Sequence, residues 1–268
     1  QLIKELPKVL RGSDYKITCV VVADKLVAIE PGDTTSALYA IAYDLGTTTV
    51  VASLMDLSTG TPLAVASMLN KQQPFGADVI SRISATMLDE NALDKLQELA
   101  HATLGELTNE VCVQAGIDPE EVFEIAIAGN ATMVQIALGI DPEPLGVAPF
   151  ILATGSYPTF LANELGVFLH PRARAYLFPA LGAYVGVDII SGALATGMDR
   201  DKRIRLFIDI GTNCEIILGD GERLIATAAP AGPAFEAASI RCGMRAAAGA
   251  IEVVTLTDTD VLIQVIED

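Results

Sequence analysis

One short turn motif occurs twice in this chain, each time between two apolar segments that alternate like β-strands. The first copy is Asp-Leu-Gly-Thr-Thr-Thr at 44–49, and the second is Asp-Ile-Gly-Thr-Asn at 209–213. Each copy is followed by a further turn and a further strand-like segment, and the copies are separated by roughly one domain length of sequence. The repeat therefore predicts a duplicated α/β fold that carries one turn in each half.

The segments around the two turns have the patterns of short strands and amphipathic helices. The expected strands are 39–43, 49–56, 62–68 and 123–128 in the first half and 205–208, 214–218 and 223–227 in the second. The expected helices are 76–90, 91–115, the segment from Asn130 to Leu138, and 188–196.

These elements divide the chain into three parts. Residues 1–35 hold two strand-like segments, 16–22 and 25–29, and a turn-rich linker. A two-stranded hairpin is only marginally stable alone, so this part is expected to be the end of a middle or linker domain. Residues 36–187 are expected to form a first subdomain, and residues 188–268 are expected to begin a second, incomplete one.

Composition limits the kinds of ligand. Of the 268 residues, 51% are hydrophobic, which supports a buried aliphatic core and argues against disorder. The formal net charge of -17 repels phosphate backbones, so nucleic-acid binding is not expected. The same charge opposes an incoming nucleotide, so a triphosphate site would depend on local backbone N–H groups and a bound cation.

The cysteines and histidines show no pattern typical of a metal site. Cys19, Cys112, Cys214 and Cys242 have no metal-ligand spacing, and the chain has only two His residues. Neither an iron–sulfur cluster nor a structural zinc is expected within this stretch. Free thiols in a reducing cytoplasm are expected instead.

One apolar segment, 176–198, is long enough to span a membrane. It contains Asp188, Pro179 and several glycines. We interpret it as a buried loop followed by a buried helix and expect no membrane span.

The two turns combine residue types that suit a phosphate and its metal ion. Glycine allows conformations that other residues resist, and successive backbone N–H groups form an anion-binding nest. The carboxylates of Asp44 and Asp209 suit Mg²⁺, directly or through water. The predicted phosphate-binding residues are Gly46, Thr47, Thr48 and Thr49 in the first turn and Gly211, Thr212 and Asn213 in the second.

A single Asp-x-Gly-Thr is more typical of a simple hairpin turn, but two copies favour a nucleoside triphosphate with Mg²⁺ held in a cleft between two halves. A third candidate is the loop at 231–236. Gly232 and Pro233 lead into a helix whose first N–H groups suit a phosphate or a ribose. Glu236, in its first turn, either contacts the ligand or complements the helix dipole.

Five stretches of the chain resemble one known family: 42–51, 70–83, 129–133, 145–150 and 231–251. They are similar to the reductive activators of corrinoid proteins, which are ferredoxin-like ATPases of the acetate and sugar kinase, heat-shock and actin superfamily. The stretches at 70–83 and 231–251 are specific to the family, whereas the turns mark only the superfamily. The resemblance implies an α/β, actin-like (ribonuclease H-like) duplicated fold with mixed sheets, its second half truncated.

The resemblance also implies a repair function. A corrinoid cofactor that carries methyl groups as cobalt(I) is inactivated by oxidation to cobalt(II), and the activator returns one electron, driven by ATP binding or hydrolysis. The electron comes from a [2Fe-2S] cluster in an N-terminal ferredoxin domain. The implied partner is a corrinoid protein, either a methyl carrier or the corrinoid subunit of a demethylase. The oligomeric state stays open, with a homodimer as one candidate.

The resemblance assigns a catalytic residue as well. In this superfamily a polar or acidic residue begins a connecting helix nine residues before a closing glycine and positions the attacking water. Asp188 stands nine residues before Gly197 and is the predicted catalytic residue. A helix N-cap is a second, compatible role for it. Arg82 is expected either to contact a phosphate or the partner, or to form a surface ion pair with an acid such as Asp78.

The given sequence departs from the family's pattern at both of its ends. It has no cluster-binding cysteine pattern, and it stops before the family's Gly-rich adenosine-binding segment, so we expect a fragment without redox activity of its own. Two other functions are compatible with the same fold: a small-molecule kinase with Asp188 as its base, and a non-catalytic actin-like docking module. A screen for phosphate transfer and titration with ATP analogues would separate these functions.

Overall fold

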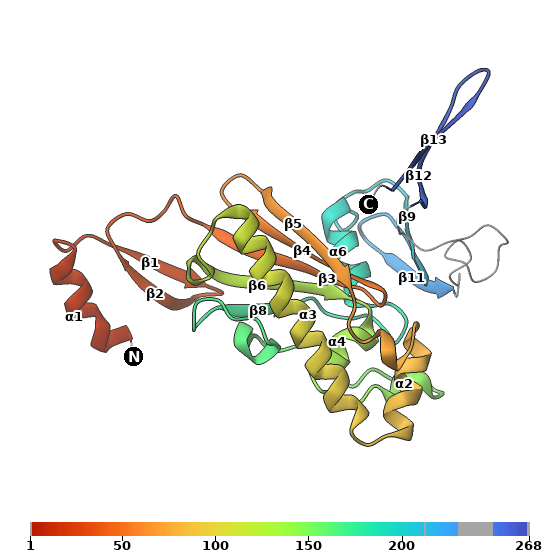
Figure 1. Cartoon of the computed structure of the whole chain (residues 1–268), viewed down its shortest axis with the longest axis horizontal. Helices are drawn as coiled ribbons and strands as arrows, with labels where there is room; N and C mark the ends of the chain where they lie inside the picture. Colours follow the sequence, from red (N-terminus) through yellow and green to blue (C-terminus); the bar gives the residue numbers. More distant parts are fainter. Residues whose placement is uncertain (1, 212, 230–248, 267–268) are drawn as a thin grey trace. The chain divides into compact units, whose positions relative to one another are not determined.

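The computed structural model describes residues 2–211, 213–229 and 249–266 (Figure 1). The chain forms two compact units, one of residues 1–199 and one of residues 200–268. The larger unit is built on a six-stranded mixed sheet, and the smaller unit on an antiparallel three-stranded sheet.

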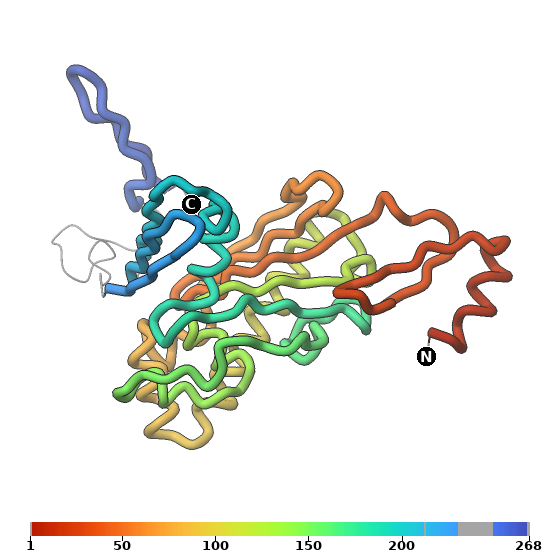
Figure 2. Tube along the Cα trace, turned by 180° about the vertical axis from the view of Figure 1, so that it is seen from behind, coloured from red at the N-terminus to blue at the C-terminus, as the bar shows by residue number. Residues whose placement is uncertain are grey.

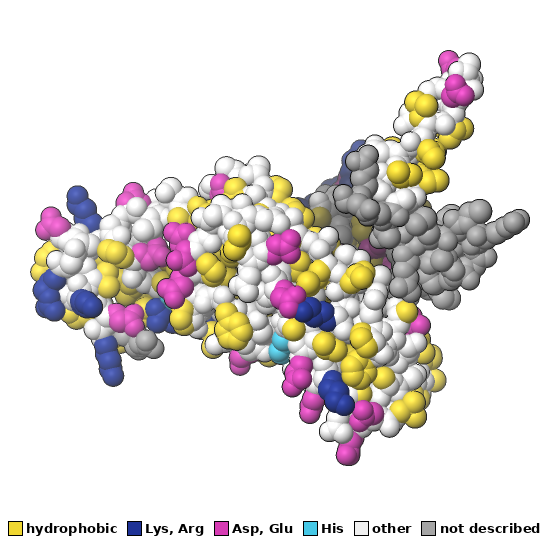
Figure 3. Space-filling view, viewed as in Figure 1, with side chains coloured by type: hydrophobic (Ala, Val, Ile, Leu, Met, Phe, Trp, Pro, Cys, Tyr) yellow, Lys and Arg dark blue, Asp and Glu magenta, His cyan; other side chains and the backbone are white. Residues whose placement is uncertain are grey.

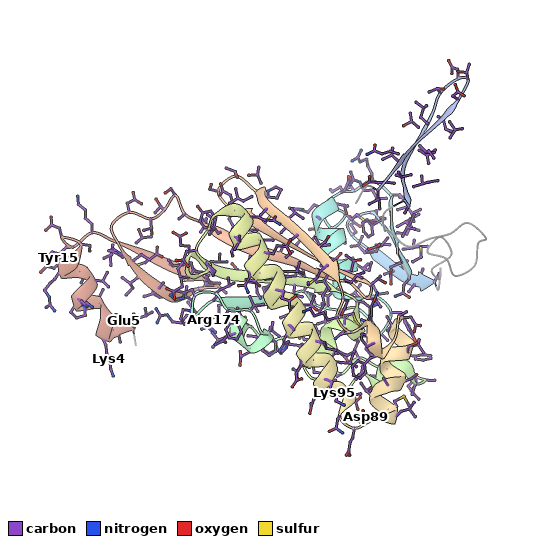
Figure 4. The ribbon with its side chains drawn as sticks, in the orientation of Figure 1. Lys4, Glu5, Tyr15, Asp89, Lys95 and Arg174 are labelled. Carbon is purple, nitrogen blue, oxygen red and sulfur yellow. The ribbon has the colours of Figure 1, made fainter. Side chains whose placement is uncertain are left out.

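The larger unit begins with a helix and a hairpin. Helix α1 (Leu2–Gly12) precedes strands β1 (Ile17–Val22) and β2 (Lys25–Pro31), which pair antiparallel as expected. The helix was not expected, because Pro7 interrupts its sequence pattern. Glu5 of α1, labelled in Figure 4, forms an ion pair of 3.7 Å with Arg172. The Nε of Arg172 also donates to the Val27 carbonyl. These bonds attach α1 and β2 to the loop that precedes β8.

The central sheet has the strand order β5-β4-β3-β6-β8-β7. Its strands are β3 (Tyr39–Leu45), β4 (Thr49–Asp56), β5 (Thr61–Leu69), β6 (Val122–Gly129), β7 (Phe160–Leu161) and β8 (Arg174–Leu177). β3, β4 and β5 form the expected antiparallel meander. β6 pairs parallel with both β3 and β8, so the sheet is mixed, as the resemblance implied.

Helices cover the sheet and its loops. They are α2 (Val79–Leu88), α3 (Ala92–Ala115), α4 (Ala131–Ala137), α5 (Glu143–Gly146) and α6 (Val187–Thr196). The long helix α3 runs across one face of the sheet (Figure 1). α2 begins at Val79 and not at the predicted 76, because the Asp78 side chain caps it by accepting from the Ser81 N–H at 2.8 Å.

The main core lies between this sheet face and α3. Alternate residues of β3 point into it, as the two-residue period of a strand requires. From α3 come side chains spaced by the helical period. The core residues of these two elements are Ile41, Tyr43 and Leu45 from β3 and Leu96, Leu104, Leu107 and Val111 from α3.

The smaller unit repeats the meander of the larger one. Strands β9 (Arg205–Ile210), β10 (Cys214–Gly219) and β11 (Leu224–Ala229) pair antiparallel in the order β11-β10-β9. A separate hairpin is formed by β12 (Ile251–Leu256) and β13 (Val261–Val265). Figure 2 shows the two meanders, β3–β5 in orange and β9–β11 in blue. The predicted recurrence of strand, turn and strand is therefore confirmed.

The apolar segment 176–198 does not form one continuous helix. It contains the end of β8, a loop and the ten-residue helix α6. Within the described residues, no helix combines the length and the apolar character that crossing a membrane requires.

The buried hydroxyl of Tyr43 gives a test of this core. It lies 2.6 Å from Thr108 Oγ1, and the Tyr43 side chain is almost fully buried. Replacing Tyr43 with Phe should lower the free energy of unfolding by about 1 kcal/mol, because one buried hydrogen bond is lost. Urea denaturation measures this change. The matched control is Tyr15→Phe, which removes a hydroxyl from an exposed ring (Figure 4) and should leave the midpoint unchanged; equal effects would contradict the prediction.

Candidate functional site

The candidate site lies at the carboxyl ends of β3 and β6. These strands run parallel, with Asp44 opposite Ala128 and Leu45 opposite Gly129. The carboxyl ends of parallel strands meet at one edge of a sheet, where loops can converge on a ligand. The Asp44 side chain is exposed and lies on the opposite face of β3 from the buried Tyr43 and Leu45.

The turn after Asp44 is tight, and glycine is required in it. A Cβ at Gly46 would lie only 2.3 Å from the Thr49 carbonyl oxygen. Thr47 is buried, whereas Thr49 is exposed. The predicted phosphate-binding residues of this turn thus form one continuous loop next to Asp44.

Three successive carbonyls of the turn accept hydrogen bonds from a single neighbouring segment, residues 70–82. The Gly46 carbonyl accepts from Asn70 Nδ2 at 2.9 Å, and the Thr48 carbonyl accepts from the Asn70 backbone N–H at 2.8 Å. The Thr47 carbonyl accepts from Arg82 Nη2 at 2.6 Å. In a planar trans peptide the N–H points opposite to the C=O. The N–H groups of Thr47, Thr48 and Thr49 therefore point away from this segment, in the arrangement of an anion nest.

The location of Arg82 corrects the expectation of a surface ion pair. Its side chain is fully buried, and its hydrogen-bond partners are neutral acceptors of the turn, of the 70–82 segment and of Met133. Burial lowers the pKa of its guanidinium to about 10, and the charge of Asp78 acts in the opposite direction. Arg82 therefore stays protonated at neutral pH. It contacts the turn at 44–49 through the Thr47 carbonyl.

The end of β6 approaches the end of β3 closely, and the start of α6 approaches the β6–α4 junction. A Cβ at Gly129 would lie 2.6 Å from the Leu45 carbonyl oxygen. A Cβ at Gly186 would lie 2.9 Å from the Ala131 nitrogen and 2.5 Å from Asp188 Oδ1. The first turn of α6 is therefore packed against the β6–α4 junction. Asp188 belongs to the same edge of the larger unit as the Asp44 turn.

The predicted N-cap role of Asp188 is wrong. Gly186 is the N-cap of α6, and Asp188 lies in the first turn of the helix. Its Oδ1 accepts from the Ile189 N–H at 2.9 Å, and its side chain is half-buried. The helix ends at Gly197, which has a left-handed φ of 68°, so the predicted closing glycine is confirmed.

The second turn lies in the smaller unit. Asp209, one residue before the end of β9, lies opposite Glu215 of β10, and the Gly211 N–H donates to the Asn213 carbonyl at 2.9 Å. Glu215, two residues after the motif, is a buried carboxylate that was not predicted as a site residue. Thr212, Gly232, Pro233 and Glu236 lie outside the described residues. Among those described, no cluster of three or more His, Cys, Asp or Glu side chains could hold a metal ion by itself.

Sequence reasoning also missed the polar residues behind the first turn. Asn70 and Gln72 are buried, and the Gln72 amide links Arg82 Nη1 to the Leu96 carbonyl. A run of Asn and Gln in a family-specific stretch was the available signal, because buried amides are retained where they satisfy specific backbone groups.

Comparison with known proteins shows the family. The RACo middle-region model matches residues 39–201, more than half of the chain. The chain belongs to the RACo family, the reductive activators of corrinoid proteins. The model of the RACo C-terminal ASKHA domain matches residues 203–268, and that of the RACo linker region matches residues 1–36. These matches and the mixed sheet establish the actin-like α/β fold.

Individual relatives agree with this placement. The corrinoid activation enzyme RamQ of Eubacterium limosum is 39% identical over 215 residues, which are 80% of this chain and 36% of RamQ. The [Co(II) methylated amine-specific corrinoid protein] reductase of Methanosarcina barkeri is 28% identical over 223 residues, 80% of this chain and 40% of the reductase.

A solved structure is similar as well. A reductive activator for corrinoid, iron–sulfur protein superposes with a TM-score of 0.87 at 37% identity, over 98% of this chain and 43% of that one. The chain thus spans less than half the length of each of these three relatives.

A substitution at Gly76 tests how the 70–82 segment holds Arg82 against the turn. It has φ of 144°, its carbonyl accepts from Arg82 Nε at 3.1 Å, and a Cβ there would lie 2.3 Å from Ser81 Cβ. Gly76→Ala should destabilise the fold by about 2–3 kcal/mol, because backbone strain and a clash add. Thermal unfolding measures this loss. The matched control is Gly60→Ala, which also has positive φ but has no atom within 4 Å of the new Cβ; it should cost only about 1 kcal/mol. A smaller loss at Gly76 than at Gly60 would contradict the prediction.

Proposed function

We propose that this chain is the ATP-binding module of a protein that reactivates corrinoid proteins by reducing cobalt(II) to cobalt(I). The observation that carries the proposal is the geometry of the turn at 44–49. Asn70 and Arg82 donate to three of its carbonyls, so the backbone N–H groups on the other side are available to an anion. Family membership supports a corrinoid protein as the target, because the relatives are named as corrinoid activators and a corrinoid-protein reductase. In this proposal the partner is a corrinoid protein, either a methyl carrier or a demethylase subunit.

The residues present fit a magnesium–nucleotide complex. Hard cations take carboxylate and water oxygens, and Asp44 offers an exposed carboxylate beside the N–H-rich turn. Asp209 is a carboxylate in the corresponding place of the second meander. When bound, Mg²⁺ supplies positive charge to the phosphate oxygens. The Gly46 to Thr49 segment would hold those oxygens by backbone donors, and Asp44 would orient metal-bound water beside it. We propose the same role toward the metal ion for Asp209 in the second turn.

Asp188 is the proposed base. It is the one carboxylate in the first turn of α6, and it is half-buried next to the β6–α4 junction. A carboxylate there can accept a hydrogen bond from a water and orient it for attack on the terminal phosphate. The free energy of nucleotide binding or hydrolysis would then drive the electron uphill to cobalt. That electron would come from a [2Fe-2S] cluster in a ferredoxin domain that the given sequence does not include.

We propose a protein, and not a nucleic acid, as the partner of the larger unit, and the distribution of charge supports this choice. Acidic side chains are spread over the face shown in Figure 3, whereas basic side chains gather around α1 and the first hairpin. Cys19, Cys112 and Cys214 are free thiols, which agrees with a cytoplasmic setting.

Replacing either turn carboxylate tests the core of the proposal. In the whole protein, Asp44→Ala and Asp209→Ala should each lower the ATP-dependent rate of cobalt(I) formation at least 10-fold, because each removes an oriented ligand to the metal ion. The absorption spectrum of the corrinoid partner measures that rate. The matched control is Asp56→Ala, the same change of charge at the opposite end of β4. Undiminished rates in both turn variants would refute the proposal.

Asp188→Asn separates catalysis from binding. This variant should keep ATP affinity within about threefold and lower the ATP hydrolysis rate by about 10²- to 10⁴-fold, because the amide cannot accept the proton of water. Isothermal titration and phosphate release measure the two quantities. The control is Asp141→Asn, where the amide oxygen can still accept from the Glu143 N–H. Loss of ATP affinity with an unchanged turnover rate would contradict the assignment.

A further inference from the structure

The Arg82 guanidinium is a buried cation with no carboxylate within ion-pair distance among the described residues. Its side chain is fully buried, and within the part of the chain that the structure describes it takes part in no ion pair. Removing a charge from water costs several kcal/mol unless an opposite charge compensates it. A fold therefore retains such a residue at a cost in stability, and such exceptions to local rules concentrate at functional sites.

All the hydrogen-bond partners of Arg82 are neutral. Nε donates to the Gly76 carbonyl at 3.1 Å, and Nη1 donates to Gln72 Oε1 at 3.0 Å. Nη1 also lies 2.8 Å from Met133 Sδ, and Nη2 donates to the Thr47 carbonyl at 2.6 Å. These four contacts fix the guanidinium plane without supplying negative charge. The carboxylate of Asp78 acts on the guanidinium only from beyond ion-pair distance.

The bond to Thr47 connects this charge to the candidate phosphate site. The Thr47 carbonyl and the Thr48 N–H belong to the same peptide and point in opposite directions. A cation on the carbonyl side polarises that peptide, so its N–H becomes a stronger donor on the other side. Asn70 orients the two flanking peptides through the Gly46 and Thr48 carbonyls, but it carries no charge.

We propose that Arg82 is a positioning residue for the phosphates of the nucleotide. It acts through the Thr47–Thr48 peptide from behind the turn, and the bound phosphate supplies negative charge on the far side of that peptide, in addition to the distant charge of Asp78. This inference rests on the proposed function, since it requires that the turn at 44–49 binds phosphate. It also explains why the segment 70–82 and the turn belong together: Asn70 sets the direction of the donors, and Arg82 sets their strength.

The test compares variants that keep or remove the charge. Arg82→Lys keeps it, whereas Arg82→Gln and Arg82→Met remove it, with and without a side-chain amide; either neutral variant suffices if the other does not fold. Titration of the whole protein with Mg-ATP and with tripolyphosphate measures affinity, and thermal unfolding without ligand measures stability. The matched control is Val111→Ala, which creates a cavity in the same core near the carboxyl end of α3, far along that helix from Leu96.

The neutral variants should bind both ligands about 10- to 100-fold more weakly, the range typical of a lost charged interaction. Arg82→Lys should stay within about fivefold of the wild type, and Val111→Ala should lose stability without losing affinity. Neutral variants that bind as tightly as the wild type would overturn the inference, and so would a lysine variant as weak as the neutral ones.

The two proposals fail in different ways. Wild-type protein that binds ATP but does not support cobalt(I) formation would refute the proposed reactivation and leave the role of Arg82 intact. Wild-type activity together with undiminished binding by the neutral variants would overturn only the role of Arg82. Wild-type protein that binds neither ligand would overturn both.

Discussion

The parallel pairing of β3 with β6 is the constraint on which the rest of the larger unit depends. It brings the carboxyl end of β3, with Asp44 and the following turn, beside Gly129 at the end of β6. A side chain at Gly129 would collide with the Leu45 carbonyl, so the approach of the two strands requires a residue without a Cβ. α4 then starts directly after β6, and its junction contacts the Gly186 end of α6. The candidate site is thus a result of one strand pairing and two close glycine contacts.

The turn itself depends on a second layer of residues. Its own sequence can form a simple hairpin, and nothing in Gly-Thr-Thr-Thr alone dictates which way the carbonyls face. The direction is set by Asn70 and Arg82, which are separated from the turn by the whole of β4 and β5. The orientation of the peptides in this Asp-x-Gly-Thr motif therefore depends on residues outside the motif.

Much of the architecture could be predicted from the sequence. Alternation in β3 and β4 and the long helical period of α3 are strong local signals, and the repeated meander follows from the repeated motif. α1 was missed because Pro7 breaks the pattern, and β7 and β8 were missed because strands of two and four residues carry too little periodicity.

The site was predictable only in part. Asp44, the turn and Asp188 have recognisable motifs, whereas the role of Arg82 depends on tertiary burial that no local pattern encodes. Its charge made a surface position the natural expectation, and only the neutral acceptors around it explain its place in the core. Which residues divide the two actin-like subdomains, and how the predicted site residues act, stay predictions.

The position of Arg82 on α2 has a mechanical consequence. Other residues of α2, such as Ile80 and Leu88, are exposed, so this helix has an outer surface as well as a side chain in contact with the turn. A rigid helix transmits displacement along its whole length, and coupling between two sites is reciprocal. The outer surface of α2 and the peptide that follows Thr47 are therefore connected through a single side chain, Arg82, which belongs to the helix and donates to the Thr47 carbonyl.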